Sequence, residues 1–266
     1  MKSIRFITVL LLSILLVLLT AGCATGSGQS SNTVVIDDDD DEEMEVWDNP
    51  DTISDVPPGV DAVGGEDTAQ INFEGEFGDF MYNPGDAVTE VDTGATVTPA
   101  TDFVYAGSQS ARIDGSIQKY KYSSSKFVSY RINAAEMLGK KNLEIVGKMI
   151  KVRIFVPSEF SNTAIQFLVL DFGFSWAESV PIQVEAGKWN TLYFKLLSSS
   201  AEDNTKYKGR QCSLASYTPE GKKKFVGQYT GNGFNSYTIN AFEIRSLNGT
   251  LGDNATVFVD SIEWEE

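Results

Sequence analysis

From residue 68 onward, short apolar or alternating runs recur and are separated by Gly, Asn, Asp and Ser, which is typical of β-strands joined by turns. In residues 148–157, KMIKVRIFVP, apolar side chains alternate with Lys151 and Arg153, so this segment is predicted to be a strand with one apolar face. Pro157 ends the run, because proline cannot donate a hydrogen bond to a neighbouring strand. The predicted strands cover residues 70–74, 110–118, 126–132, 149–156, 164–171, 189–196, 236–245 and 256–264.

One segment has a helical pattern instead, residues 133–140 with the sequence NAAEMLGK. Asn133 is the predicted N-cap, Glu136 follows three residues later, and Gly139 is the predicted end of the helix. Many strands, one helical turn and no regular alternation of strands with helices predict an all-β fold, an antiparallel two-sheet β-sandwich. Residues 198–235 are predicted to form a long, polar, irregular loop, and such loops often carry function.

The start of the chain reads as an export signal. Lys2 and Arg5 precede an apolar run over residues 6–19, which is shorter than the roughly 20 apolar residues that a membrane span needs. The run ends in LLTAGC, which resembles the lipobox of bacterial lipoproteins, so we expect residues 1–22 to be a signal peptide and Cys23 to carry lipid. The alternative is an ordinary signal peptide that contains a cysteine. Both alternatives place the protein outside the cytoplasm, and lipidation would anchor it to the bacterial cell envelope.

Charge separates residues 23–67 from the rest of the chain. Residues 24–67 contain 14 Asp and Glu and no Lys or Arg, whereas residues 68–266 have a net charge of −4. The first segment is also rich in Gly, Ser and Pro, so it is predicted to be a disordered, extended tether that precedes one domain over residues 68–266. Its acidic run, residues 37–43, either binds calcium weakly or serves as a solvated spacer. So acidic a chain is not expected to bind nucleic acid.

Histidine is absent from the sequence, and this excludes several kinds of active site. A Ser-His-Asp triad or a Cys-His pair cannot form. If Cys23 carries lipid, Cys212 is the one remaining thiol, so neither an intrachain disulfide nor an ordinary His/Cys zinc site is available. Carboxylate chemistry, metals with oxygen ligands and aromatic surfaces remain.

Five segments resemble a known family in their order and spacing. They read INFEGEFGDF from residue 71, YAGSQSARIDG from 105, VRIFVP from 152, VEAGKWNTLYFKL from 184 and ATVFVDSIEWEE from 255. Over about residues 70–266 the chain resembles the calcium-containing β-jelly-roll carbohydrate-binding modules of the galactose-binding-like superfamily. The resemblance implies a jelly-roll sandwich, a structural calcium ion and binding of a polysaccharide or oligosaccharide, such as a mannan or β-glucan.

The resemblance also implies where calcium would bind. In such modules a buried ion ties the first strand to the last, and Glu74 and Asp260 occupy the matching places. The turn that contains Gly107 and Gln109 could add carbonyl oxygens, and calcium prefers six to eight hard oxygen ligands. The alternative is that Glu74 and Asp260 are exposed charges at strand ends.

Trp176 is the predicted centre of a sugar-binding surface. It follows a predicted strand in DFGFSWAES, residues 171–179, among small and polar residues, although a large aromatic residue can equally belong to the core. Sugar rings stack on aromatic faces while polar side chains bind their hydroxyls. The other predicted contacts are Tyr120, Tyr122, Tyr130, Gln166, Arg153 and Asp171.

These observations lead to one expected function and two alternatives. We expect a lipid-anchored protein, in contact with the membrane through its anchor alone, that binds a polysaccharide or oligosaccharide without catalysis. One alternative is a glycoside hydrolase, because Glu74 and Glu76 stand two apart on a predicted strand, about 7 Å from each other. The other is a structural envelope protein that binds a protein partner. The sequence leaves open whether a neighbouring glycosidase or transporter receives the ligand.

Overall fold

In the computed structural model, the described residues begin at Trp47 and end at Glu265. The chain divides into two units, Met1–Glu42 and Glu43–Glu266, and every described residue belongs to the second. The described residues are 47–48, 52–53, 68–82, 95–119, 126–173, 175–198, 212–217, 223–229, 234–250 and 252–265. The predicted signal peptide, Cys23, and the predicted sugar contacts Tyr120 and Tyr122 lie outside these residues.

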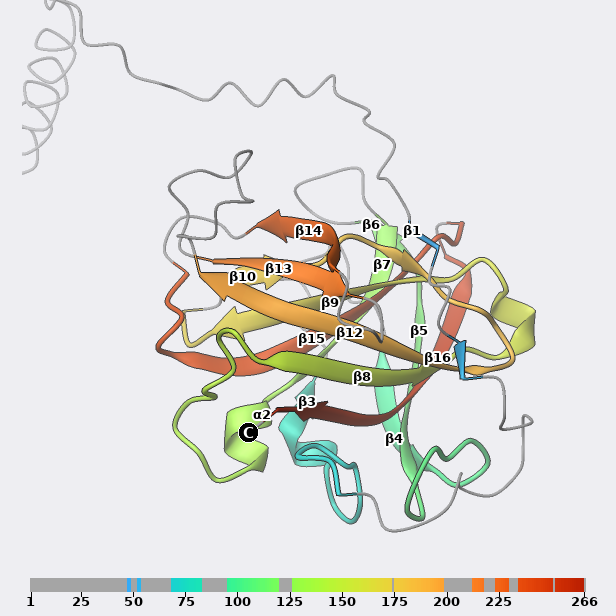
Figure 1. Cartoon of the computed structure of the whole chain (residues 1–266). Helices are drawn as coiled ribbons and strands as arrows, with labels where there is room; N and C mark the ends of the chain where they lie inside the picture. Colours follow the sequence, from blue (N-terminus) through green and yellow to red (C-terminus); the bar gives the residue numbers. More distant parts are fainter. Residues whose placement is uncertain are drawn as a thin grey trace, which may run out of the picture. The chain divides into compact units, whose positions relative to one another are not determined.

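Strands of the described residues form two sheets of eight strands each (Figure 1). Sheet A has the order β1 (Trp47–Asp48), β11 (Ile182–Gln183), β9 (Ala164–Asp171), β15 (Ile239–Leu247), β7 (Lys126–Ile132) and β3 (Met81–Tyr82), with β10 (Trp176–Glu178) beside β9 and β6 (Gln118–Lys119) beside β7. Sheet B has the order β14 (Lys223–Tyr229), β13 (Cys212–Tyr217), β12 (Trp189–Ser198), β8 (Met149–Phe155), β16 (Asn254–Trp264), β5 (Ser110–Ser116) and β4 (Thr96–Ala100), with β2 (Thr52–Ile53) beside β12. The named strands pair antiparallel except β1 with β11, so the predicted two-sheet antiparallel β-sandwich is confirmed.

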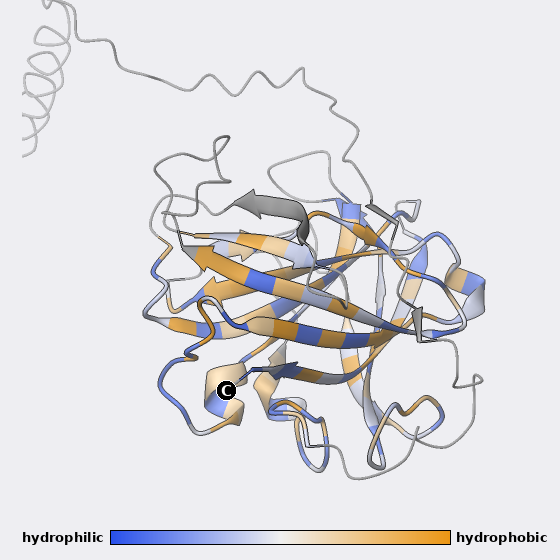
Figure 2. Cartoon of the chain, viewed as in Figure 1, coloured by the Kyte–Doolittle hydropathy of each residue, from blue (hydrophilic) through white to orange (hydrophobic). Residues whose placement is uncertain are grey.

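The core lies between the two sheets because each long strand turns alternate side chains inward. Hydrophobic and hydrophilic residues alternate along β8 and β12 (Figure 2), and Val152 of β8 is fully buried in the core. Sheet A contributes Phe167 and Phe242, whose rings lie 5.2 Å apart. Phe167 also stacks on Phe194 of sheet B at 4.9 Å, so the aromatic contacts join the two layers.

The first predicted strand, residues 70–74, is not a strand. Ile71 forms an isolated bridge with Ile262 of β16, and no ladder follows. Phe73 and Gly75 have φ values of 55° and 74°, which lie in the left-handed region and interrupt an extended chain. The predicted strands 126–132 and 164–171, in contrast, match β7 and β9 residue for residue.

Residues 198–235, predicted to be an irregular loop, contain two strands of sheet B. β13 and β14 pair antiparallel and extend the sheet beyond β12. β13 reads CSLASY, and its small residues Cys212, Ser213 and Ala215 are fully buried. Small polar residues concealed the strand in the sequence, because they carry little of the apolar alternation that marks a strand.

The predicted tether also contributes to the fold. β1 pairs with β11 in sheet A, and β2 pairs with β12 in sheet B. Residues 47–48 and 52–53 therefore add a short strand to each sheet from within the predicted tether.

The single predicted helix is α2 (Ala134–Met137), and two 3-10 turns, η1 (Gly78–Phe80) and η3 (Ser158–Phe160), occur in loops. Asn133 does not cap the backbone of α2 as predicted, because its side-chain amide donates to Glu136 Oε2 at 3.3 Å. Gly139 has a φ of 61° and ends the helix as predicted. In the described part of the chain, no helix is both long and apolar enough to cross a membrane.

Candidate functional site

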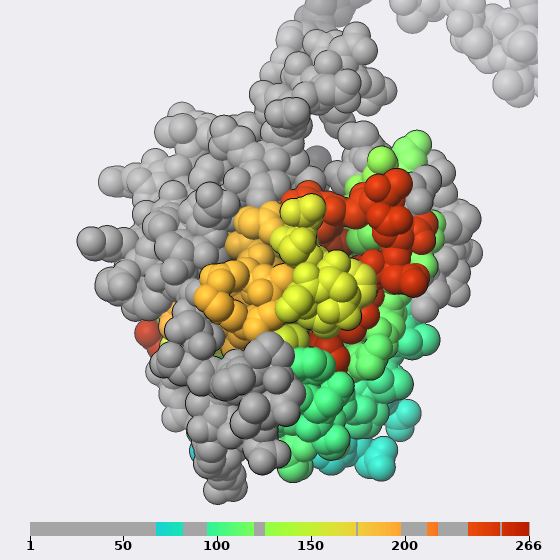
Figure 3. All heavy atoms as spheres, turned by 90° about the vertical axis from the view of Figure 1, so that its right-hand side faces the viewer, coloured from blue at the N-terminus to red at the C-terminus, as the bar shows by residue number. Residues whose placement is uncertain are grey.

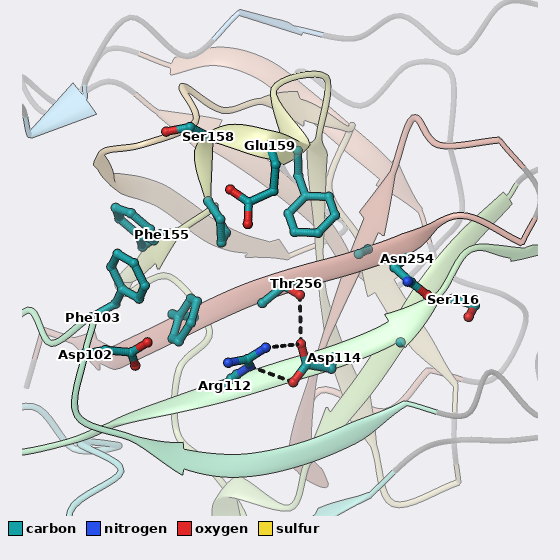
Figure 4. Close-up of a pocket in the computed structure, with 15 residues that line it drawn as sticks. Asp102, Phe103, Arg112, Asp114, Ser116, Phe155, Ser158, Glu159, Asn254 and Thr256 are labelled. Atoms are coloured by element: carbon teal, nitrogen blue, oxygen red, sulfur yellow. Dashed lines mark hydrogen bonds and ion pairs between the residues drawn. The ribbon is translucent and has the colours of Figure 1, made fainter. Parts of the chain in front are cut away.

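A groove of about 820 Å³ lies on the outer face of sheet B (Figure 4). Ile113 of β5 and Val257 of β16 point into the core, so the side chains next to them in each strand point outward. The groove is lined by Asp102, Phe103, Arg112, Asp114, Gly115, Ser116, Phe155, Pro157, Ser158, Glu159, Phe160, Asn254, Ala255, Thr256 and Phe258. Figure 3 shows segments far apart in sequence gathered on one face, in green (about residues 95–119), yellow and orange (about residues 155–198) and red (residues near the C-terminus).

Packed aromatic rings form one wall of the groove. Phe103 stacks on Phe155 at 4.4 Å and lies 4.8 Å from Phe258. Phe155 and Phe258 are each 1% exposed, whereas Phe103 is only partly buried. Phe103 therefore presents the accessible part of an aromatic surface that the other two rings support.

Charged and hydroxyl groups line the groove beside the aromatic rings, and the Arg112 guanidinium lies over the ring of Phe258. Arg112 Nε and Nη2 donate to the two carboxylate oxygens of Asp114 at 2.7 and 3.1 Å, and Thr256 Oγ1 donates to the same carboxylate at 2.7 Å. The hydrogen bond from Arg112 to Asp114 raises the pKa of the guanidinium above its ordinary value, so this group stays charged. The side chains of Arg112 and Asp114 remain 42% and 35% exposed, and both are available to a ligand.

Glu159 completes the groove from η3. Figure 4 shows its carboxylate directed into the space above Arg112 and Thr256. Asp102 lies at the Phe103 end, and Asn254 lies toward the other end with Ser116. The arrangement offers hydrogen-bond donors and acceptors beside an aromatic surface, which suits a polar ligand that also has an apolar face.

The residues predicted to hold calcium come together around residues 105–109. Glu74 Oε1 accepts hydrogen bonds from the backbone N–H groups of Ser108 and Gln109 at 2.7 and 3.3 Å, and Ser108 Oγ donates to Glu74 Oε2. Burial alone would raise the pKa of Glu74, but these hydrogen bonds outweigh it and hold the pKa below its ordinary value of 4.5. Asp260 Oδ2 accepts from the N–H groups of Tyr105 and Ala106, so the same loop links the first and last segments of the domain.

Oxygen atoms near this loop are of the type that can serve as calcium ligands. The carbonyl oxygens of Phe73 and Gly75 both accept a hydrogen bond at 2.7 Å from Nε2 of Gln109, so a cation on which they converge would replace this amide. The carboxylates of Glu74 and Asp260, bound by the same loop, are further hard oxygen atoms, the type that calcium prefers. Gln109 contributes its side-chain amide here rather than the predicted carbonyl. Among the described residues, no group of three or more Asp, Glu or Cys side chains could hold a metal.

The carboxylate pair proposed for a hydrolase is not arranged as predicted. Glu74 and Glu76 do not lie on a strand, and Gly75 between them has a φ of 74°. The argument that two residues two apart share one face of a strand therefore does not apply to them.

Trp176 lies in β10, on the face of sheet A that points away from the core. Its indole N–H donates to Glu178 Oε2 at 2.9 Å, and its ring packs against Leu168, Leu170 and Ala241. Trp176 is partly exposed, so its stacking on a sugar stays a prediction. Gln166 lies on the same face of β9 but is 5% exposed, and its amide donates to the carbonyl of Ser179.

Three further predicted contacts, Tyr130, Asp171 and Arg153, do not share a surface with Trp176. Tyr130 is 6% exposed and belongs to the core between the sheets, so its ring cannot serve as a platform. Asp171 is buried at the end of β9 and binds backbone N–H groups. Arg153 lies on sheet B, where it donates to Ser261 Oγ and Glu263 Oε1. The prediction of one surface built from these residues is therefore wrong.

A buried charged network occupies the outer face of sheet A. Arg131 donates to Glu243 Oε2 through Nη2 at 2.6 Å, and Arg245 donates to Glu243 Oε1 through Nε at 2.8 Å. Ser129 Oγ also donates to Oε1, and Glu243 is fully buried. Arg245 reaches Glu178 Oε2 at 3.2 Å, and burial raises the pKa of Glu178 despite this contact. Charges at alternate positions of β7 and β15 predict a solvated face, so the sequence did not reveal their burial.

Similarity to known proteins is found in the fold and not in the sequence. No protein-family model and no curated protein matches the sequence. Among solved structures, the chain is similar to a carbohydrate-binding module of the β-sandwich superfamily at 15% identity and a TM-score of 0.45, covering 76% of this chain and 64% of that one. It is similar to an exo-β-agarase at 12% identity and a TM-score of 0.48, covering 74% of this chain and 25% of the agarase.

A xylan-binding domain from Paenibacillus barcinonensis is also similar, at 12% identity and a TM-score of 0.39, with coverage of 76% of this chain and 97% of that domain. The chain thus spans less than two thirds of the first two proteins. Identities this low assign no function to its residues, and the function has to be argued from the groove itself.

Proposed function

We propose that this protein binds a polysaccharide or oligosaccharide without catalysis, and that the groove on sheet B is the binding site. The observation that carries the proposal is the presence, in one open groove, of the Phe103 ring and the exposed pair Arg112–Asp114. A sugar ring has an apolar face that stacks on aromatic rings and hydroxyls that accept and donate hydrogen bonds. A volume of about 820 Å³ lies within the range of small-ligand sites.

The test is binding of soluble mannans, β-glucans and xylans to the full-length protein and to its Arg112→Ala variant. Removing a charged hydrogen-bond donor costs about 1.5–3 kcal/mol, so affinity is expected to fall at least about tenfold. The folding stability should change by less than about 1 kcal/mol, because the pair with Asp114 is exposed to solvent. The measurement is isothermal titration, with urea unfolding in parallel.

The matched control is Lys148→Ala, which removes a cation from the bend just before β8, away from the groove, and should bind as the parent does. Failure of the parent to bind any of the three glycans, or equal affinity of parent and Arg112→Ala, would contradict the proposal. Release of reducing sugar from a bound glycan would instead identify a hydrolase, with the carboxylates of Asp102, Asp114 and Glu159 as its candidates.

We further propose that calcium binds near residues 105–109 and stabilises the fold. Support comes from the converging carbonyls of Phe73 and Gly75 and from the carboxylates of Glu74 and Asp260. When bound, the ion would supply positive charge between the first and last segments of the domain. Its role would be structural, with no part in contacting sugar.

We also propose that the protein is held at the bacterial cell envelope by lipid on Cys23, on the basis of the LLTAGC segment. The Cys23→Ser variant is expected to move from the membrane fraction to the soluble fraction when cells are fractionated, because its acyl chains are lost. Cys212→Ala is the control, since Cys212 is buried in β13 and should leave the distribution unchanged. A Cys23→Ser protein that stays with the membranes would refute the anchor.

A further inference from the structure

Two aromatic side chains stand exposed where sheet A ends. Phe172 is 73% exposed and Tyr237 is 85% exposed, the highest values among the large hydrophobic side chains of the described residues. Phe172 follows β9 and Tyr237 precedes β15, and these strand ends are neighbours in the sheet (Figure 1). The N–H of Phe172 donates to the carbonyl of Thr238 at 2.9 Å, so the two turns are joined directly.

One buried carboxylate holds both turns in place. Asp171 is 2% exposed, and its Oδ1 accepts from the N–H of Ser175 at 2.9 Å while its Oδ2 accepts from the N–H of Asn235 at 2.7 Å. Asn235 Oδ1 in turn accepts from the N–H of Tyr237 at 3.0 Å. Hydrogen bonds therefore fix the backbone beneath each ring, while the rings themselves are left in solvent.

Exposed rings on a fixed backbone are suited to binding. A Phe or Tyr side chain can bury roughly 150–250 Å², and burial gives about 25 cal/mol per Å². Such rings lose little conformational freedom on binding when their backbone is already positioned, which raises the net affinity. Single exposed apolar residues are common, but these two rings lie on turns that a backbone hydrogen bond joins.

The surroundings of the two rings favour a sugar over the other occupants. The turns, residues 171–173 and 234–238, contain no Lys or Arg, whereas segments that bind membrane surfaces combine aromatic with basic residues. A stable protein interface buries at least about 1,200 Å² in total, more than two side chains supply. A sugar ring needs only an aromatic face and nearby polar groups, and the exposed side chain of Asn235 is bound to the backbone of Tyr237.

We propose that Phe172 and Tyr237 form a second carbohydrate contact, which acts together with the groove on long chains. This inference rests on the proposed function. The groove lies by η3, just before the start of β9, and the two rings lie at the end of this eight-residue strand. The two contacts are thus roughly 25 Å apart along the strand direction. A polymer has the length to reach both, whereas a short oligosaccharide does not, so the second contact should raise affinity for polymers alone.

The experiment compares the polymer bound best in the titrations with a short oligosaccharide prepared from it. The double variant Phe172→Ala/Tyr237→Ala is expected to bind the polymer at least about tenfold more weakly than the parent. Its affinity for the short oligosaccharide and its melting temperature should match those of the parent, because neither ring fills a cavity. Val146→Ala is the control, since Val146 is 39% exposed on another part of the surface.

The possible results distinguish failure of the second contact from failure of the proposed function. A double variant that binds the polymer as the parent does overturns the second contact and leaves the groove intact. Equal weakening for polymer and oligosaccharide overturns it as well, because it would place the rings within the first site. A parent that binds no glycan overturns both proposals. Loss of binding to vesicles of phosphatidylcholine and phosphatidylglycerol, with polymer binding unchanged, would assign the rings to a lipid surface instead.

Discussion

Replacing Glu243 with Gln is expected to lower the free energy of unfolding by about 3–5 kcal/mol, because it removes one partner of a buried ion pair. In the variant, the guanidinium groups of Arg131 and Arg245 would remain charged and buried but would lack the carboxylate that both bind in the parent. The measurement is urea unfolding of the two proteins at neutral pH. Glu263→Gln is the control, since the ion pairs of Glu263 with Lys151 and Arg153 lie nearer to solvent, and its loss should stay within about 1 kcal/mol.

The same variant predicts a pH dependence. Burial alone would raise the pKa of Glu243, but the charges of Arg245 and Arg131 outweigh it and hold the pKa below its ordinary value of 4.5. A carboxyl group whose pKa is lowered by folding contributes stability above its unfolded pKa, and this contribution is lost as the pH falls through its folded pKa. The stability difference between parent and Glu243→Gln should therefore be full at pH 6–7 and should shrink below pH 4.5. A difference that stays constant down to pH 3 would contradict this assignment of charge.

Adding EDTA is expected to lower the melting temperature of the protein, and adding back calcium is expected to restore it. A ligand that binds only the folded state stabilises it by about 2.7 kcal/mol at a hundredfold excess over its dissociation constant. For a domain of this size, that corresponds to about 5–10 °C. Differential scanning calorimetry with and without EDTA measures the shift.

Glu74→Gln separates a specific calcium site from a general ion effect. The variant should melt at the same temperature in EDTA and in calcium, because one of the two carboxylates of the site is gone. Glu76→Gln is the matched control, since Glu76 is exposed two residues away, and it should respond as the parent does. Identical melting of the parent in EDTA and in calcium would show that the hydrogen bonds of Glu74 and Asp260 hold the loop without a metal.

The strands that could be predicted from the sequence are those in which apolar and polar residues alternate within one continuous segment. β8 is an example, because Lys151 and Arg153 alternate with core residues and mark both faces. The strand predicted around Phe73 was wrong, because the apolar residues of this segment have the pattern of a strand, whereas the left-handed φ at Phe73 interrupts the extended chain. Backbone conformation at a single residue depends on tertiary contacts, here with β16, that local sequence does not contain.

The groove could not be predicted because pairing between distant strands creates it. Asp114 lies opposite Thr256, and Arg112 opposite Phe258, only through the register of β5 with β16. A shift of one residue would turn these side chains toward the core. The resemblance predicted that Glu74 and Asp260 share one calcium site, and in the structure the backbone of one loop, residues 105–109, binds both carboxylates.

If the protein is anchored by lipid on Cys23, a force on the anchor would act first on β1 and β2. The stretch between Cys23 and the first sheet contact at Trp47 can span at most about 86 Å, since an extended chain covers about 3.3–3.6 Å per residue. A pull on the anchor would reach the sandwich at β1 and β2, which are two residues long and hold few hydrogen bonds each. These strands would detach before the sheets open. Their release would lengthen the chain between the anchor and the sandwich, so a pull on the anchor would be taken up before the two sheets separate.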